Sequence, residues 1–277
     1  MTTPPARVER KFFVAPNRMI LALALVRRTC RWDEDYPEEQ INSLYFDTPD
    51  LEQHESSLAG EFVKAKIRIR WYGAEHDPHD SAERTVDVAS RDEAVPAWLE
   101  LKERRGFVST KQRAAVEVAA GALRPQVLAA GIVSISALTS TMAGFGFFTS
   151  KRLCPVIAVS YWRRRFVEPR TGFKIAFDSD VRSSVVMPGI GRGEQGLRLS
   201  GAVIEVKGPS AELPARLREL GELGSSWTRF SKYSSSLDAH ACDLASVSRL
   251  WPSGVVHVEP CTGVPTSNRE VATCGSK

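Results

Sequence analysis

The 277-residue sequence contains no long apolar run and little excess charge of either sign. Its most apolar stretch is the eight residues 19–26, whereas about 20 are needed to cross a bilayer. The 37 basic and 33 acidic residues leave a net charge of +4, which excludes a histone-like or polybasic-tail protein. With 43% hydrophobic and 25% charged residues, the composition also excludes a largely disordered chain.

Sequence signals for zinc, disulfides and secretion are equally sparse. The five cysteines are scattered and form no C-x-x-C pair, so neither a zinc site nor a disulfide framework is indicated. The glycine-rich segment 189–196 lacks the G-K-[ST] ending of a P-loop. No charged N-terminal segment precedes an apolar one, so we see no secretory signal and expect a cytoplasmic protein.

What the sequence does contain is alternation of apolar and polar residues, the pattern of β-strands. It predicts eight strands, over residues 7–14, 41–47, 62–72, 97–105, 111–118, 155–167, 172–180 and 199–207. Helices are predicted over 16–29, 213–223 and 231–244, with one or two more within 121–149. Asp47 and Asp50, beside Pro49, indicate a turn and the start of a helix.

Strands spread over the whole length, with helices inserted between them, predict one α+β domain that is mainly antiparallel β. We place this domain at residues 1–245. The remaining residues, 246–277, are rich in Pro, Ser, Thr and Gly, which predicts a disordered or loosely packed tail.

The charged residues of the predicted strands share one side of each strand. Lys66, Arg68 and Arg70 alternate with Ile67 and Ile69, which places the basic side chains on one face, about 6.6 Å apart. The same arrangement recurs at Glu9 and Lys11, Glu100 and Lys102, Lys111 and Arg113, Tyr161 and Arg163, Lys174 and Asp178, and Glu205 and Lys207. A solvated sheet face normally mixes polar types, so this bias toward Lys and Arg favours binding of a linear anion such as a phosphate chain.

If the sheet closes, these charged faces line its lumen. Eight strands leave an interior wide enough for side chains or one small ligand. A basic lumen with a few carboxylates is unfavourable when empty, so we expect it to hold polyanions together with Mg²⁺ or Mn²⁺. The predicted fold is therefore an eight-stranded, tunnel-like closed barrel with flanking helices.

Seven segments carry a family resemblance: residues 8–12, 43–49, 66–73, 99–106 with 111–113, 159–163, 203–207 and 231–233. In order and spacing they resemble the VTC domain, the catalytic domain of the vacuolar transporter chaperone polyphosphate polymerase. That family belongs to the triphosphate tunnel metalloenzymes, or CYTH-like superfamily. The resemblance covers about residues 7 to 240. It implies transfer of the γ-phosphoryl group of ATP to a growing polyphosphate chain.

The resemblance also implies roles for individual residues. Those expected to act on the triphosphate or the growing chain are Lys11, Arg68, Arg70, Lys102, Lys111, Arg163 and Lys232. Further substrate contacts are expected from Lys66, Arg113, Tyr161, Lys174, Lys207 and Ser231. Glu205 would hold Mn²⁺ or Mg²⁺, with Glu9 and Glu100 as supporting carboxylates. The implied partners are ATP and polyphosphate or pyrophosphate, and a membrane-protein partner would be needed for translocation of the chain.

Two departures from the family pattern bear on the reaction. Hydrolytic tunnel enzymes commonly begin with E-x-E-x-K, and Arg7 stands here at the first glutamate position, which favours the polymerase branch. Lys174 stands where an arginine is expected, so the charge is kept and the bidentate fork is lost. An inorganic triphosphatase of the same fold and a non-catalytic polyphosphate- or nucleotide-binding module remain alternatives. Nucleic-acid binding is not expected, because interleaved aromatic residues on the basic face are missing.

Overall fold

The computed structural model describes residues 8–73, 93–106, 108–123, 125–128, 132–190, 196–210, 212–223, 225–226, 230–241 and 257–260. Arg7, the segment 191–195 and most of the predicted tail therefore lie outside the described residues. The strands are β1 (Val8–Val14), β2 (Arg31–Trp32), β3 (Glu38–Asp47), β4 (Val63–Tyr72), β5 (Ala94–Arg105), β6 (Val108–Ala119), β7 (Cys154–Val167), β8 (Lys174–Val185), β9 (Leu197–Gly208), β10 (Ser225–Ser226) and β11 (His257–Pro260). The helices are α1 (Met19–Thr29), α2 (Glu52–Ala59), α3 (Pro125–Leu128), α4 (Ile135–Gly144), α5 (Leu220–Leu223) and α6 (Lys232–Ala241).

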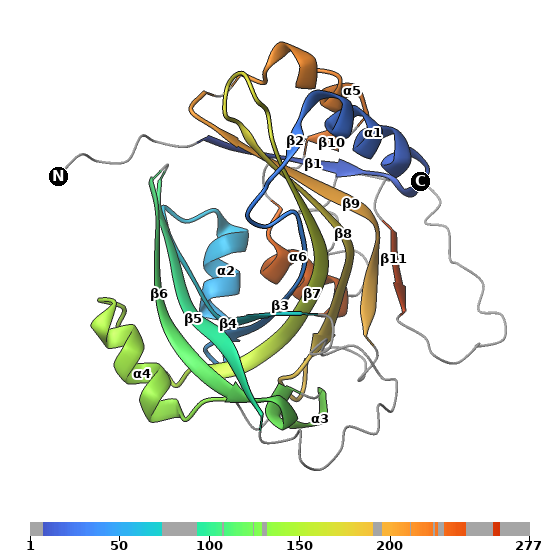
Figure 1. The fold of residues 1–277 in the computed structure, drawn as a ribbon. Coiled ribbons are helices and arrows are strands. Elements are labelled where there is room, and N and C mark those ends of the chain that lie inside the picture. Colours follow the sequence, from blue (N-terminus) through green and yellow to red (C-terminus); the bar gives the residue numbers. More distant parts are fainter. Residues whose placement is uncertain are drawn as a thin grey trace, which may run out of the picture.

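All strands join one antiparallel sheet, ordered β10-β1-β9-β8-β7-β3-β4-β5-β6, with β11 on β9 and β2 on β7. Its eight long strands correspond to the eight predicted ones, so the mainly antiparallel α+β class is confirmed. The closed barrel is wrong: among the described residues, β6 and β10 end the path without pairing to each other. The sheet is instead strongly curled around a concave side (Figure 1).

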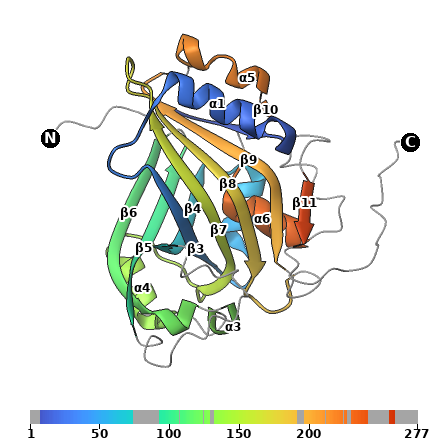
Figure 2. The same ribbon diagram turned by 45° about the vertical axis from the view of Figure 1, so that its right-hand side comes forward.

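Two groups of helices cover the convex side of this sheet (Figures 1 and 2). Helix α1 buries Leu25 and Val26 against β1, β8 and β9, and Leu220 of α5 joins the same apolar cluster. Helix α4 buries Leu138 and Met142 against β3, β4 and β5. The apolar residues that alternate with the charged ones thus form the core on the outer face, as the strand pattern requires.

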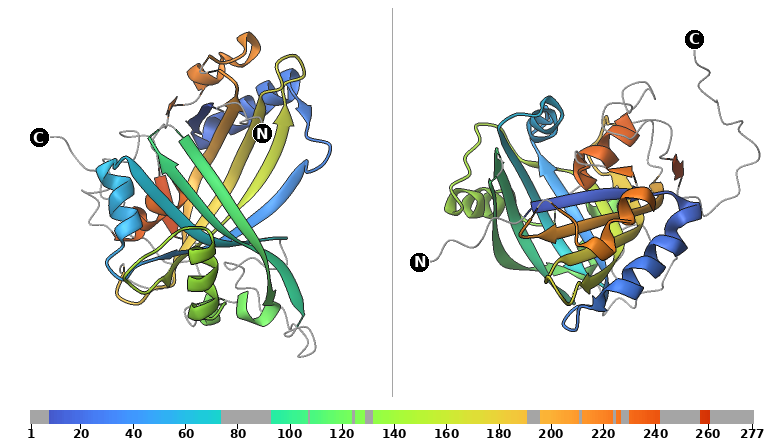
Figure 3. Two further views of the ribbon diagram at one scale, coloured as in Figure 1. Left: turned by 90° about the vertical axis from the view of Figure 1, so that its left-hand side faces the viewer. Right: turned by 90° about the horizontal axis from the view of Figure 1, so that it is seen from above.

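The concave side holds α2 and α6, which lie beside each other within the curl (Figures 1 and 3). Helix α6 packs on β7, β8 and β9, and α2 packs on β3 and β4. The predicted helix over 213–223 is reduced to a 3₁₀ turn, Ala215–Leu217, followed by the single turn of α5. In the part of the chain that the structure describes, no helix has the length and apolar character to cross a membrane.

Candidate functional site

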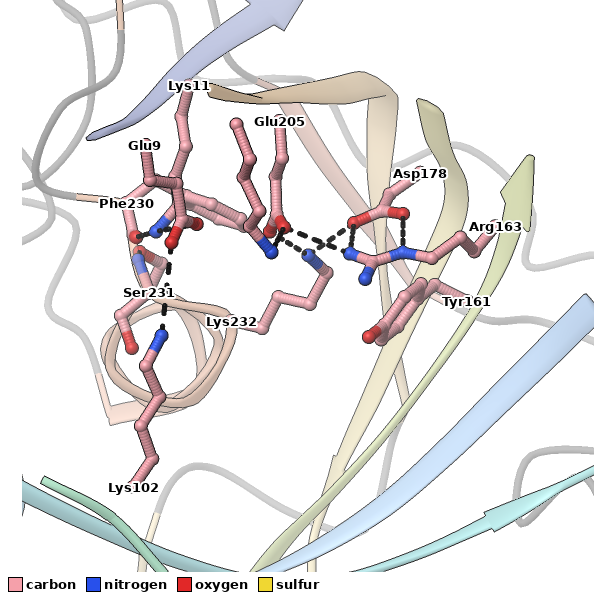
Figure 4. A network of polar contacts seen from close by, with 12 residues as sticks. Glu9, Lys11, Lys102, Tyr161, Arg163, Asp178, Glu205, Phe230, Ser231 and Lys232 are labelled. Carbon is pink, nitrogen blue, oxygen red and sulfur yellow. Dashed lines mark hydrogen bonds and ion pairs between the residues drawn. The ribbon is translucent and has the colours of Figure 1, made fainter. Parts of the chain in front are cut away.

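Figure 4 shows charged side chains from several strands and from the start of α6 pointing toward one another on the concave side of the sheet. A first group, here called the inner ion-pair cluster, consists of Arg163, Asp178, Glu205 and Lys232. The Arg163 guanidinium donates through Nε and Nη2 to the two oxygens of Asp178, both at 2.6 Å. Lys232 Nζ lies 2.6 Å from Asp178 Oδ2 and 3.1 Å from Glu205 Oε1. Strands β7, β8 and β9 and the first residue of α6 thus converge on one point.

The cluster is buried and charged at neutral pH. Burial raises the pKa of Glu205, but the nearby cations Lys232 and Arg163 lower it by more. Its pKa therefore lies well below the usual range. The pKa of Asp178 is lowered in the same way, because Arg163 and Lys232 outweigh its burial. Both cations also lie over the ring of Tyr161, with Lys232 Nζ 4.5 Å and Arg163 Cζ 5.3 Å from its centroid.

A second group, here called the lysine cluster, consists of Lys11, Lys66 and Lys102, with Glu9 among them. Glu9 lies 3.5 Å from Lys11 Nζ and 3.9 Å from Lys102 Nζ, so side chains of β1 and β5 meet across the concave side of the sheet (Figure 4). Burial lowers the pKa of Lys66, and repulsion from Lys11 and Lys102 adds to this, so that the pKa falls to about 7. The pKa of Lys102 is also lowered, by burial first. Positive charge therefore exceeds negative charge here.

A third group lies on the neighbouring rows of β4, β5 and β6. Arg68 donates to Glu100 through Nε at 2.8 Å and to the hydroxyl of Tyr45 at 3.1 Å, and Lys111 forms a further ion pair with Glu100. Burial raises the pKa of Glu100, but Arg68 and Arg70 bring it down to about 2. Both oxygens of Glu100 thus form ion pairs with basic side chains, and the pair with Arg68 fixes the position of that guanidinium on β4.

The remaining predicted residues lie at different distances from these groups. Arg70 donates to the hydroxyl of Tyr161 at 3.3 Å, and Lys207 Nζ lies 3.4 Å from Glu205. Ser231 Oγ accepts the backbone N–H of Ser234 at 3.3 Å, at the start of α6. Arg113 stacks at 4.3 Å over the ring of Trp98. Lys174 is 62% exposed and lies 3.8 Å from Asp33, so it makes no ion pair with the inner cluster in the described residues.

Some contacts of this surface were not foreseen. The expectation that aromatic residues are missing from the basic face is wrong, because Arg113 lies over the ring of Trp98, and Arg163 and Lys232 lie over the ring of Tyr161. The two-residue spacing of Trp98 and Glu100 places both on one face, so this contact had a signal in the sequence. Alternation places Asp178 on the charged face of its strand, but it does not predict the bidentate pair with Arg163. Nothing local indicated that Asp47 accepts the hydroxyl of Tyr233, since 186 residues separate them.

The carboxylates were also tested as ligands for a divalent cation. Among the described residues, no three His, Cys, Asp or Glu side chains gather as a metal site. Glu100 is paired with Arg68 and Lys111, and Glu205 is paired with Arg163, Lys207 and Lys232. Glu205 also lies near enough to Glu9 to raise the pKa of that carboxyl. A donor set of one or two carboxylates suits Mg²⁺ or Mn²⁺ only when phosphate oxygens complete the coordination. The residues fit a metal that binds together with a phosphorylated substrate.

The structure is thus a curled, open antiparallel sheet whose concave side carries more basic than acidic side chains among the residues described above. The sequence matches the model of the VTC domain family over residues 6–240, and the chain belongs to that family. The resemblance read from its seven segments is thereby confirmed. A search of curated proteins found no match.

Solved structures show only a distant likeness. A candidate adenylate cyclase from Vibrio parahaemolyticus is 12% identical with a TM-score of 0.35, covering 80% of this chain and 86% of that chain. A candidate adenylate cyclase from Bacillus halodurans is 16% identical with a TM-score of 0.39, covering 74% and 83%. The Mediator head module of Schizosaccharomyces pombe gives 13%, a TM-score of 0.31, and coverage of 77% and 88%. With TM-scores this low, the family assignment rests on the VTC match.

Proposed function

We propose that this chain is a metal-dependent polyphosphate polymerase that transfers the γ-phosphoryl group of ATP to a growing polyphosphate chain. Membership of the VTC domain family supports the reaction class. The observation that carries the proposal is the lysine cluster. Burial, together with repulsion from Lys11 and Lys102, brings the pKa of Lys66 to about 7. Such a surface is stabilised by a polyanion, which removes the repulsion as it binds.

In the proposed reaction, an oxygen of the terminal phosphate of the chain forms a bond to the γ-phosphorus of ATP. The bond from that phosphorus to the bridging oxygen breaks, which releases ADP and lengthens the chain by one phosphate. This chemistry depends mainly on positioning and on neutralising the phosphoryl oxygens. Lys11, Lys66 and Lys102 supply mobile charges, and Arg68 and Arg163 supply guanidinium groups that ion pairs hold in place.

Glu205, with Glu9 near it, would hold the divalent cation together with phosphate oxygens. Bound there, Mg²⁺ or Mn²⁺ would supply further neutralisation of phosphate charge. Lys232 and Arg163 keep the Glu205 carboxylate ionised, and Lys232 also orients it by bridging it to Asp178. The face of the Tyr161 ring makes cation–π contacts with both Arg163 and Lys232.

The test is incubation of the purified chain with ATP and either Mg²⁺ or Mn²⁺, followed by electrophoresis of the products. We expect a ladder of polyphosphate with matching release of ADP. Glu205→Gln should lower the rate by about 100-fold or more, because the metal and the fixed charges both depend on this carboxylate. The matched control is Lys151→Met, which removes a cation paired with exposed Asp50 and Glu52 and should leave the rate unchanged.

The same experiment separates the alternatives. Sustained release of orthophosphate without chains would identify an inorganic triphosphatase. Tight binding of tripolyphosphate with no product under either metal would identify a binding module. A wild-type rate in Glu205→Gln would contradict both enzymatic functions.

A further inference from the structure

Lys232 reaches the inner ion-pair cluster in a different way from its partners. Arg163, Asp178 and Glu205 extend from neighbouring strands β7, β8 and β9, whose hydrogen bonds fix their spacing. Lys232 is the first residue of α6, so the position of its ammonium depends on how that helix is packed. The site is thus incomplete unless something fixes α6 at its N-terminal end.

The residue that follows, Tyr233, makes such a contact. Its side chain is 1% exposed, and its hydroxyl donates to Asp47 Oδ2 at 2.6 Å. Burial raises the pKa of Tyr233, and the Asp47 carboxylate raises it further, so the hydroxyl stays protonated and remains a donor. The ring stacks on Tyr45 with 5.1 Å between centroids.

Asp47 is itself held rigidly at the start of α2. Its Oδ1 accepts the backbone N–H groups of Thr48 and Gln53 at 2.7 and 3.0 Å, and Oδ2 accepts that of His54 at 3.0 Å. Leu51, which precedes α2, provides no side-chain cap, so Asp47 satisfies the N-terminal amides of this helix from the end of β3. A carboxylate with four donors around it is a fixed anchor for the Tyr233 hydroxyl.

A second contact joins α6 to α2, more than one helical turn along α6 from Tyr233. His54 Nε2 of α2 lies 3.1 Å from Asp238 Oδ1 of α6, and both side chains are nearly buried. The His54 ring also meets the ring of Tyr233 edge-on at 6.0 Å. Helix α6 is therefore attached near α2 at two positions, Tyr233 and Asp238.

From these contacts we infer that Tyr233 and Asp47 are positioning residues, whose hydrogen bond fixes the Lys232 ammonium between Asp178 and Glu205. They touch no substrate, and their effect reaches the anion through Lys232. The inference rests on the proposed function in one respect, namely that this surface binds phosphate chains.

The test is a double-mutant cycle read by calorimetric titration of inorganic tripolyphosphate into the full chain. Tyr233→Phe keeps the ring and removes the hydroxyl, and we expect about tenfold weaker binding, as for loss of a hydrogen bond to a charged group. In a Lys232→Met background the same change should weaken binding less than about twofold, because residues that act as a unit are not additive. Tyr72→Phe, which removes the hydroxyl of a half-buried tyrosine at the end of β4, is the matched control and should leave the affinity unchanged.

A merely structural role would lower the affinity equally in both backgrounds, and that result, like an unchanged affinity in Tyr233→Phe, would overturn the inference. If Tyr233→Phe fails to fold, Asp238→Asn breaks the second contact and must show the same dependence on Lys232. Failure of the wild-type chain to bind tripolyphosphate would instead contradict the proposed function, and with it any role for the placement of Lys232 in binding.

Discussion

The inner ion-pair cluster and the lysine cluster share one concave surface and differ in charge balance. Arg163 and Lys232 face Asp178 and Glu205, so two cations meet two carboxylates at hydrogen-bonding distance. In the lysine cluster, three lysines share one carboxylate, Glu9, which lies 3.5 Å from Lys11 Nζ and 3.9 Å from Lys102 Nζ.

The direction of the pKa shifts separates the two groups in the same way. In the balanced cluster the pKa of Lys232 is raised, because Asp178 and Glu205 outweigh its burial. In the lysine cluster the pKa of Lys66 falls to about 7, because burial and its neighbouring lysines act in the same sense. The first group has balanced charge in the folded chain, which holds Arg163, Lys232 and Glu205 in fixed positions. The second is completed by an anion and provides binding energy.

The largest difference should appear when the balanced cluster loses a carboxylate. Asp178→Asn leaves Arg163 and Lys232 buried with Glu205 as their remaining partner, and we expect a loss of about 3–5 kcal/mol in the free energy of unfolding. Urea denaturation followed by circular dichroism measures this. Asp50→Asn, which breaks an exposed pair with Lys151, should change stability very little. Equal effects of the two substitutions would show that the cluster is not a structural unit.

The lysine cluster should respond in the opposite way. Lys66→Met removes a repelled cation and keeps the apolar stem, so the free energy of unfolding should stay the same or rise. Binding of tripolyphosphate should weaken by about tenfold, as for one lost charged hydrogen bond. Denaturation and calorimetric titration of the same preparation give both values. A large loss of stability in Lys66→Met would remove the distinction between the two groups.

The smallest expected effect is a dependence on pH. The pKa of Lys66 is about 7 in the folded chain and near 10.5 when it is unfolded, so between these values the unfolded chain binds more protons. Stability without ligand should therefore rise with pH across this window, and Lys66→Met should remove part of that slope.

Binding of the anion should depend on pH with the opposite sign. Because tripolyphosphate favours the charged amine, its affinity should fall above pH 7, by up to about tenfold per pH unit for one coupled proton. Titrations in two buffers of different ionisation enthalpy should detect proton uptake at pH 8 in the wild type. The same uptake in Lys66→Met would assign the effect to another group.

The strands and their charged faces could be predicted because alternation is local. Lys66 to Trp71 shows which residues are buried without any knowledge of the partner strands. Closure of the sheet could not be predicted, because edge and paired strands alternate in the same way, and only the path from β10 to β6 shows the open side.

The site was predicted as a set of residues, and its division into groups was not. The register of β7 on β8 shifts between Ser160 and Trp162, and Asp180 adopts a positive φ of 51°, as a bulge allows. These irregularities lie next to Arg163 and Asp178, so simple alternation does not determine how the two side chains meet. The contact of Tyr233 with Asp47 depends on the packing of α6 against α2, which no local pattern encodes.

The most direct measurement is an experimental structure of the chain with inorganic tripolyphosphate bound. We predict phosphate oxygens within hydrogen-bonding distance of Lys11, Lys66 and Lys102, with Arg163 and Asp178 still paired as in the free chain. Phosphate bound on the convex face, or a complex in which the three lysines contact no phosphate, would contradict the assignment of the lysine cluster as the anion site.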